Sequence, residues 1–188
     1  MKNRKICIIG AGIFGSTIAL QLAKKKFTID LYEKEKDILE GVSFKNQQRF
    51  HLGYHYPRSK KTISEIKKSY KEFIKLYGYK VFGKTVNLYA ISSKNSILTF
   101  KKYLHLLKKN KLKFKKNKYI NIFSSLIEGS IITPEKNLNI FKLKKKIKEK
   151  IFKSKKIKLF LGNKIKKINL KNYHKVIVCC YYNNNIVL

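Results

Sequence analysis

The chain has 188 residues, of which 44% are hydrophobic and 13% aromatic, so it can bury a core and is not intrinsically disordered. Its formal net charge of +35 suggests a polyanion such as RNA as a partner. Only three of the 45 basic residues are arginines and the lysines are spread from end to end, so an AT-rich codon bias explains the charge better than a nucleic-acid site does.

The N-terminal residues predict a strand, a glycine turn, a helix and a second strand in succession. Lys5–Ile9 is a short apolar run with β-branched residues, which is typical of a strand buried on both faces of a parallel sheet. The turn is Gly10-Ala11-Gly12-Ile13-Phe14-Gly15, and apolar residues then recur at near-helical spacing as far as Lys25. Thr28–Tyr32 is the second strand, and Glu33 closes it.

A G-x-G-x-x-G sequence between a strand and a helix is typical of a turn that binds the pyrophosphate of a dinucleotide. Gly10 permits the tight turn, Gly12 leaves room for the phosphates, and Gly15 lets the helix pack against the strand. The helix N-terminus supplies N–H donors and a partial positive charge. A carboxylate at Glu33 can accept hydrogen bonds from both ribose hydroxyls and would repel a 2′-phosphate, so the pattern favours FAD or NAD over NADP.

Two features bear on the compartment in which the chain works. Ile6–Ala23 is almost uncharged and follows basic residues, as in a signal peptide or a short membrane span, but its glycines and the following Lys24-Lys25-Lys26 argue against both. No other stretch is long and apolar enough to span a bilayer. Cys7, Cys179 and Cys180 have no disulfide or zinc spacing, which predicts no metal site and fits a reducing cytoplasm.

Residues 41–58 form a second window, in which residues that run against the codon bias gather. Two of the three arginines and two of the four histidines lie here. The candidates for catalysis are His51, His55, Tyr56 and Arg58: a histidine can act as a base or electrostatic partner, and Arg58 or Arg49 can bind a substrate carboxylate through both guanidinium nitrogens. For each of them, packing or satisfying loop carbonyls is the structural alternative.

This window resembles flavoproteins of the glycine and D-amino-acid oxidase type, in which a Gly-x-Ser loop and an Asn after the second strand pass along the cofactor. The resemblance rests on Gly41, Ser43, Asn46, His51 and Gly53. It implies FAD as the cofactor and an oxidoreductase that transfers a hydride from a carbon bearing an amine or a hydroxyl to the flavin. The residues expected to bind FAD are Gly10, Ala11, Gly12, Ile13, Phe14, Gly15, Glu33, Lys34, Ser43, Asn46 and Arg49.

The rest of the chain predicts alternating helices and strands. Thr62 and Glu65 form a capping-box pattern that predicts the start of a helix through Tyr77. Asn137 is expected to cap a helix that carries Ile140, Leu143, Ile147 and Ile151 on one face. The other expected elements are a strand over Val86–Ile91, a helix over Ile97–Lys109, and strands over Ile157–Leu161 and Lys175–Cys180.

Together these elements predict an α/β chain with a Rossmann-like FAD-binding βαβ domain and a partial α+β substrate domain inserted in it. The expected FAD-binding domain is discontinuous, over 1–80 and 136–188, and the expected substrate domain covers 81–135. Members of the resembling family are roughly twice as long, so the chain is expected to be their N-terminal half. By itself it is then expected to have little or no oxidase activity.

The predicted partners are a small amino or hydroxy acid as substrate and, if the chain is a half, a second polypeptide that completes the fold. Two alternatives stay open at this point. One is an inactive remnant that binds FAD weakly or not at all. The other is a basic protein that binds RNA or an anionic surface on a βαβ fold, which steep salt dependence would reveal.

Overall fold

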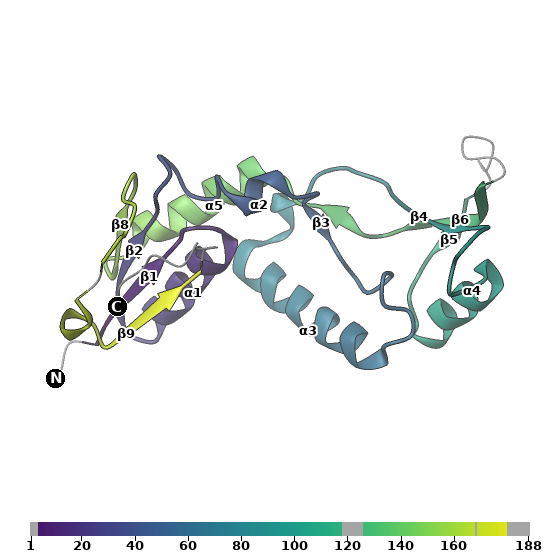
Figure 1. Cartoon of the computed structure of the whole chain (residues 1–188), viewed down its shortest axis with the longest axis horizontal. Coiled ribbons are helices and arrows are strands. Elements are labelled where there is room, and N and C mark those ends of the chain that lie inside the picture. Colours follow the sequence, from purple (N-terminus) through teal and green to yellow (C-terminus); the bar gives the residue numbers. More distant parts are fainter. Residues whose placement is uncertain (1–3, 118–125, 168, 180–188) are drawn as a thin grey trace. The chain divides into compact units, whose positions relative to one another are not determined.

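The computed structural model describes residues 4–117, 126–167 and 169–179, and these fall into two compact units (Figure 1). Unit 1 is formed by residues 1–48 and 140–188, and unit 2 by residues 49–139. The second unit is therefore inserted, in sequence, between the two segments of the first.

Unit 1 is built on a parallel sheet of four strands in the order β8-β2-β1-β9. The strands are β1 (Lys5–Ile9), β2 (Thr28–Tyr32), β8 (Ile157–Phe160) and β9 (Lys175–Val178). The two N-terminal strands have the predicted bounds. β8 and β9 confirm the expected positions of the later strands, although Cys180, the expected end of the last one, lies outside the described residues. The apolar side chains of β1 and β2 are almost all buried, as expected for strands inside a parallel sheet, whereas those of β9 at the edge are half-buried or exposed.

The helices of unit 1 are α1 (Ile13–Lys24), the short α2 (Val42–Lys45) and α5 (Ile140–Lys153). α1 buries Ala19, Leu20 and Ala23, which lie near the strands that flank it in sequence. The apolar residues of α5 recur every three or four positions, and all four that the sequence placed on one face are buried. The expected cap at Asn137 is wrong, because that residue belongs to a strand, β7 (Lys136–Asn137), and α5 begins three residues later.

Unit 2 contains an antiparallel sheet in the order β4-β6-β5 and a two-stranded pair, β3-β7. Its strands are β3 (Arg49–Phe50), β4 (Asn87–Ser92), β5 (Lys115–Lys116) and β6 (Ile127–Thr133), and its helices are α3 (Lys60–Tyr77) and α4 (Phe100–Lys109). The 3-10 turns are η1 (Tyr79–Val81) in unit 2 and η4 (Leu170–Asn172) in unit 1. The core of unit 2 consists of Tyr54, Ile63, Tyr89, Tyr103, Leu107, Leu112 and Ile131.

The start of α3 differs from the predicted capping box. Ser59 is the N-cap, and its Oγ accepts a hydrogen bond from the Thr62 N–H at 3.2 Å. Thr62 is therefore three positions inside the cap, where its N–H needs an acceptor. The sequence pattern placed the helix correctly but shifted its first turn.

The unit boundaries also differ from the expected domain boundaries, since residues 49–80 group with unit 2 rather than with the parallel sheet. Aromatic packing accounts for this: the Phe50 ring lies 5.4 Å from Tyr70 and 4.6 Å from Phe73, both on α3. Ile63 of α3 enters the core of unit 2. These contacts hold α3 to β3, within unit 2.

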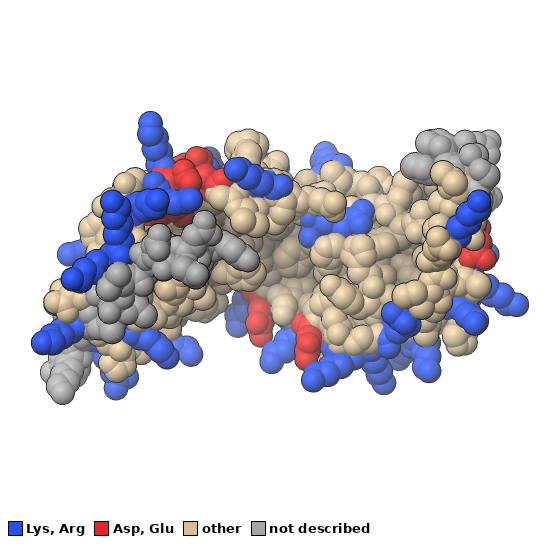
Figure 2. Space-filling view, viewed as in Figure 1, with Lys and Arg blue, Asp and Glu red and all other residues tan. Residues whose placement is uncertain are grey.

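Among the described residues, no helix has both the length and the apolar character needed to cross a membrane. On the face drawn in Figure 2, lysines and arginines are spread over both units instead of gathering in one patch. This distribution agrees with the end-to-end spread of lysines in the sequence.

Candidate functional site

The glycine turn of unit 1 follows β1 and requires glycine at two positions. Gly10 has a φ of +96°, in the region that favours glycine, and its N–H donates to the Tyr32 carbonyl at 2.7 Å. A Cβ on Gly15 would lie 1.8 Å from the Gly10 carbonyl oxygen, so only glycine allows α1 to approach the turn this closely. The strand, the turn and the helix are thereby locked together.

The first turn of α1 presents backbone donors without a protein anion to receive them. Gly12 is the N-cap, no side chain caps it, and the first turn contains no acidic residue. The Ile13 N–H donates to Ser43 Oγ at 3.1 Å. The N–H groups of Gly12 and Phe14 donate to none of the other described residues. A helix terminus in this state attracts an anion.

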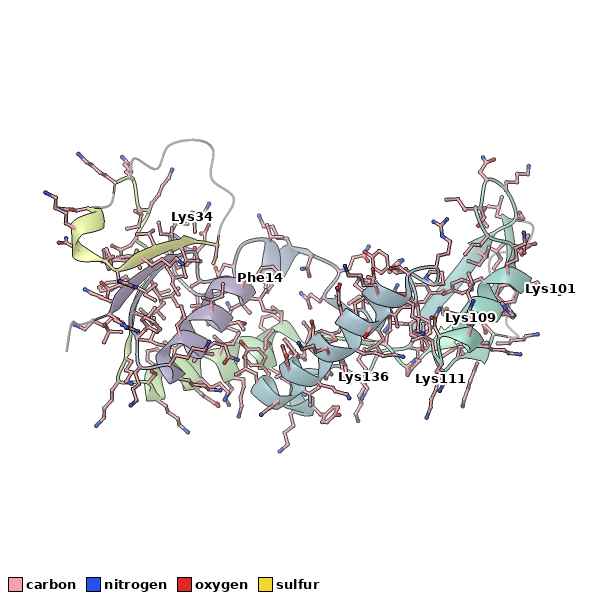
Figure 3. The ribbon with its side chains drawn as sticks, turned by 90° about the horizontal axis from the view of Figure 1, so that it is seen from below. Phe14, Lys34, Lys101, Lys109, Lys111 and Lys136 are labelled. Atoms are coloured by element: carbon pink, nitrogen blue, oxygen red, sulfur yellow. The ribbon has the colours of Figure 1, made fainter. Side chains whose placement is uncertain are left out.

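Ser43 and Phe14 are the side chains next to this helix terminus. A Cβ on Gly12 would come within 3.2 Å of Ser43 Oγ, so the segment that carries Ser43 lies directly against the turn. Phe14 is 75% exposed at the start of α1 (Figure 3). The structure therefore brings Ser43, one of the residues expected to bind the cofactor, to the glycine loop.

Glu33 stands at the end of β2 and is buried. Its Oε2 accepts a hydrogen bond from the Ala11 N–H at 2.7 Å, and its Oε1 accepts one from the Glu35 N–H at 3.2 Å. Each carboxylate oxygen keeps a further lone pair for another donor. Glu33 thus fixes the backbone of the glycine loop and can still accept hydrogen bonds from a ribose.

Two further predicted cofactor residues of unit 1 are exposed. The Lys34 side chain, labelled in Figure 3, forms an ion pair with Glu35 at 3.7 Å and is 61% exposed. Asn46 Oδ1 accepts the Gln48 N–H at 2.8 Å in a local turn. Neither side chain makes a hydrogen bond to the glycine loop among the described residues.

Arg49 lies in unit 2 and is held there by its neighbours. Its Nε donates to Asn87 Oδ1 at 2.8 Å, and its guanidinium carbon lies 4.9 Å from the centre of the Tyr89 ring. The same Nε is 4.0 Å from Glu135 Oε2. Arg49 is therefore part of a hydrogen-bonded cluster inside unit 2.

The structure brings the two candidate histidines together. The ring centres of His51 and His55 are 4.8 Å apart, and the His55 ring lies 4.9 Å from that of Tyr89. Tyr56 is 51% exposed, with its ring 6.4 Å from His55. Arg58 is exposed and makes no hydrogen bond or ion pair with any described residue, so its guanidinium is available to a ligand.

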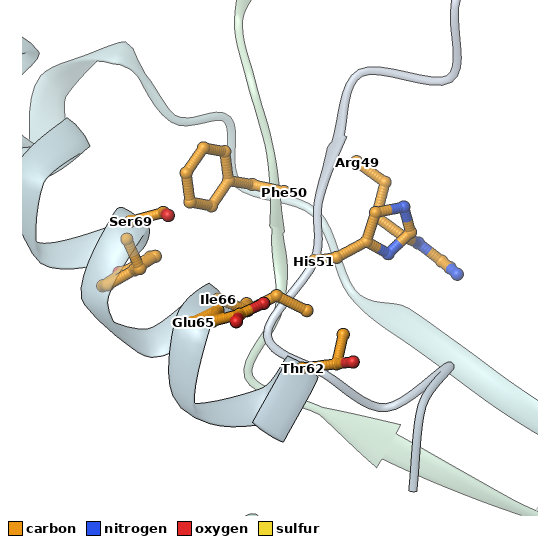
Figure 4. Close-up of a pocket in the computed structure, with 8 residues that line it drawn as sticks. Arg49, Phe50, His51, Thr62, Glu65, Ile66 and Ser69 are labelled. Atoms are coloured by element: carbon orange, nitrogen blue, oxygen red, sulfur yellow. The ribbon is translucent and has the colours of Figure 1, made fainter. Parts of the chain in front are cut away.

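A pocket of about 340 Å³ in unit 2 lies beside these residues (Figure 4). The β3 segment contributes one wall and α3 the other. The lining residues are Arg49, Phe50, His51, Thr62, Glu65, Ile66, Ser69 and Tyr70. Of the four candidate catalytic residues, only His51 lines it.

His55 is exposed at the surface, but its partial burial lowers its pKa below the ordinary value of 6.5; electrostatic repulsion from nearby His51 and Arg49 lowers it further, whereas the Glu135 carboxylate acts in the opposite direction. A lowered pKa leaves the ring neutral near pH 7, able to accept a proton. Burial also raises the pKa of Tyr89, and its hydrogen bond to Glu135 adds to this effect.

Sequence reasoning gave no site role to Glu135, Tyr89 and Asn87, which are all buried. A signal was present for one of them. Glu135 is one of ten acidic residues in the chain, and it follows Pro134, one of only two prolines. The hydrogen-bond partners of Glu135 on β4 are far from it in the sequence, and the pairing of β4 with β6 brings them together.

The sequence matches the model of the family described as DAO, FAD dependent oxidoreductase, over residues 5–129. The match covers more than half of the chain, and the chain belongs to this family. A similar protein is the FAD-dependent monooxygenase FPY4 of Fusarium mangiferae, which is 27% identical over 135 residues, or 72% of this chain and 37% of FPY4.

Two solved structures share the fold. L-proline dehydrogenase from P. horikoshii superposes with a TM-score of 0.68 at 20% identity, covering 94% of this chain and 52% of the dehydrogenase. L-α-glycerophosphate oxidase from Mycoplasma pneumoniae, solved with FAD bound, superposes with a TM-score of 0.66 at 15% identity, covering 95% and 53%. The chain spans about half the length of these structures and less of FPY4.

These neighbours confirm the predicted α/β fold with a parallel, Rossmann-type sheet. The residues of unit 1 also fit the cofactor that gives the family its name. The Gly12 and Phe14 N–H groups, which have no acceptor among the described residues, and the missing Cβ at Gly12 suit a diphosphate, and the Glu33 carboxylate at the end of β2 suits a ribose.

Proposed function

We propose that unit 1 binds FAD and that the chain forms part of an oxidoreductase acting on a carbon that bears an amine or a hydroxyl. The observation that carries the proposal is the first turn of α1. There, the backbone N–H groups of Gly12 and Phe14 have no acceptor among the described residues. These donors would hold the pyrophosphate.

Each neighbour of that turn has a separate part in the binding. Ser43 fixes the Ile13 N–H and so sets the direction of the remaining donors. Glu33 holds the loop through Ala11 and accepts hydrogen bonds from the adenosine ribose. Gly12 leaves room for the phosphates because it has no side chain, whereas a Cβ there would lie 3.2 Å from Ser43 Oγ.

The oxidised bond is proposed from the reported structures, whose names include a dehydrogenase of proline, an amine, and an oxidase of glycerophosphate, an alcohol. Bound FAD supplies the hydride acceptor. His51 and His55 are the proposed proton acceptors, because the lowered pKa of His55 keeps that ring neutral near pH 7. Arg58, whose guanidinium is available, is proposed to bind a substrate carboxylate.

Unit 2 is proposed as part of a substrate domain, and a second polypeptide is proposed to complete the fold. The support is length: the chain covers only 52% and 53% of the two solved structures. We further propose a cytoplasmic protein, in keeping with the free cysteines Cys7 and Cys179. Turnover of amino and hydroxy acids by the chain supplemented with FAD, with and without candidate second polypeptides, tests this part.

Retention of flavin tests the binding proposal. The chain is purified with added FAD and separated from free flavin, and the flavin spectrum of the protein fraction is recorded. The proposal expects about one flavin per chain and loss of that flavin when Gly12 is replaced by valine. A folded chain that retains no flavin would contradict it.

A further inference from the structure

Among the described residues of unit 2, Glu135 has the one buried carboxylate, and it lies close to the segment that carries His51 and His55. It is 1% exposed and follows the end of β6. Its Oε1 accepts a hydrogen bond from the Leu52 N–H at 2.6 Å, and its Oε2 accepts one from the Tyr89 hydroxyl at 2.6 Å. A buried carboxylate is costly unless such donors surround it.

The same residue also contributes its main chain to the cluster. The Asn87 Nδ2 donates to the Glu135 carbonyl at 2.8 Å, and Asn87 Oδ1 accepts from Arg49 Nε at 2.8 Å. Arg49 Nε lies 4.0 Å from Glu135 Oε2, which makes it a charged partner at longer range. Glu135 thereby joins β4 to the segment from Arg49 to Leu52.

We propose that Glu135 is a positioning residue, which holds the Arg49–Leu52 segment in place and favours the uptake of a proton by His55 through its negative charge. The path is short. The Tyr89 hydroxyl donates to Glu135, and the Tyr89 ring lies 4.9 Å from the His55 ring. His55 thus packs on a tyrosine whose hydroxyl is bound to a carboxylate.

Three charged groups among the described residues act on the proton affinity of His55, each in a definite direction. His51, from the same segment, and Arg49, from β3, oppose a positive charge on His55. Glu135, after β6, favours that charge, and burial opposes it. Tyr89 and Tyr56 contribute ring contacts. Glu135 is the group that keeps the proton affinity of His55 from falling further.

This inference deepens the proposed function, in which the histidines accept a proton. Its test needs neither FAD nor substrate, so its failure can be told apart from failure of flavin binding. The imidazole resonances of His55 are followed by NMR through a pH titration of the whole chain. Glu135→Gln keeps an acceptor for the Leu52 N–H and removes the charge, and Glu135→Asp keeps the charge and shortens the side chain.

The proposal expects a lower His55 pKa in Glu135→Gln than in the unchanged chain, and a smaller change in Glu135→Asp. Glu128→Gln is the matched control, because Glu128 lies in β6, its carboxylate accepts from the Phe100 N–H, and it is not among the charged groups that act on the pKa of His55. The control should leave the His55 pKa unchanged. A folded Glu135→Gln chain with an unchanged His55 pKa overturns the proposal.

A measurement on the unchanged chain keeps the proposal testable if both Glu135 variants fail to fold. The side-chain carboxyl carbon of Glu135 is observed by NMR across the range in which His55 titrates. The proposal requires this resonance to stay at the position of an ionised carboxylate. A protonated Glu135 in that range would remove the charge on which the inference rests, and so would overturn it.

Discussion

The Glu33 carboxylate accepts a hydrogen bond from the Ala11 N–H at 2.7 Å, so the acid that ends β2 holds the turn that follows β1. The two strands are paired in parallel from Lys5↔Thr28 to Ile9↔Tyr32, which brings their carboxyl ends to the same edge of the sheet. Glu33, whose place in the sequence predicts ribose recognition, therefore also shapes the glycine turn. Variants at Glu33 must be interpreted with both roles in mind.

Glu33→Gln tests ribose binding while leaving the hydrogen bond to the glycine turn in place. The amide keeps an acceptor for the Ala11 N–H but loses the negative charge that strengthens a hydrogen bond from a ribose hydroxyl. We expect FAD affinity to fall by about 1–3 kcal/mol, measured by fluorescence titration. Glu35→Gln is the control, since that side chain is 43% exposed and pairs only with Lys34 among the described residues. Equal affinities in all three chains would count against ribose recognition.

Gly12→Val is expected to weaken FAD binding about tenfold or more. The added Cβ would lie 3.2 Å from Ser43 Oγ, and the branched methyl groups would extend toward the space assigned to the pyrophosphate. The measurement is flavin stoichiometry after gel filtration, with circular dichroism to check that the sheet remains. Gly83→Ala is the control, because a Cβ there makes contacts of 3.7 Å and 4.0 Å only. Unchanged stoichiometry in Gly12→Val would show that the phosphates bind elsewhere.

The lowered pKa of Asp37 leads us to expect that the stability of unit 1 depends on pH. Burial acts to raise the pKa of Asp37, but the Ile38 N–H and the ammonium groups of Lys148 and Lys144 together lower it below the ordinary 3.8. A carboxyl with a lowered folded pKa stabilises the fold above its unfolded pKa, and this stabilisation is lost as the pH falls through the folded value.

Asp37→Asn should therefore reduce the free energy of unfolding at pH 7 by about 0.5–1 kcal/mol, the range for partly exposed ion pairs. The difference should shrink below pH 3.8 and vanish at lower pH. Urea denaturation at a series of pH values measures it. Glu149→Gln is the control, with a carboxylate 4.0 Å from Lys146 and 45% exposed. A difference between Asp37→Asn and the unchanged chain that persists at low pH would rule out the ionic explanation.

Ile147→Ala tests the packing of α5 on the parallel sheet. The Ile147 side chain is fully buried, and truncation leaves a cavity, so we expect the free energy of unfolding to fall by about 2–5 kcal/mol. Phe141→Ala, on the same helix at a residue that is 68% exposed, should cost much less. Similar losses in the two variants would show that α5 does not bury the predicted face.

The sequence predicted unit 1 closely because its signals are local. β1, the glycine turn and β2 lie within residues 5–33, and the period of α5 identifies its buried face without reference to the rest of the chain. The cap of α3 was misplaced by three residues because Thr62 and Ser59 are both good capping residues. Only the backbone direction before the helix distinguishes them.

The sequence pattern did not predict the hydrogen bonds that Glu135 makes next to the histidines. The hydrogen bond between Tyr89 and Glu135 joins residues 46 positions apart, and that between Leu52 and Glu135 joins residues 83 positions apart. These pairs depend on the register of β4 and β6, which places Asn87 opposite Thr133. Composition identified the window that contains His51 and His55, but the pairing of the strands is needed to show that Glu135 binds Leu52 and Tyr89 next to them.

Titration of FAD into the purified chain measures directly whether unit 1 binds this cofactor. Fluorescence and absorbance are followed at fixed salt, with the Gly12→Val chain titrated in parallel. We expect saturable binding of about one FAD per chain, and a much weaker response in Gly12→Val. A folded chain that binds no FAD, or that binds it equally well with valine at position 12, would contradict the account.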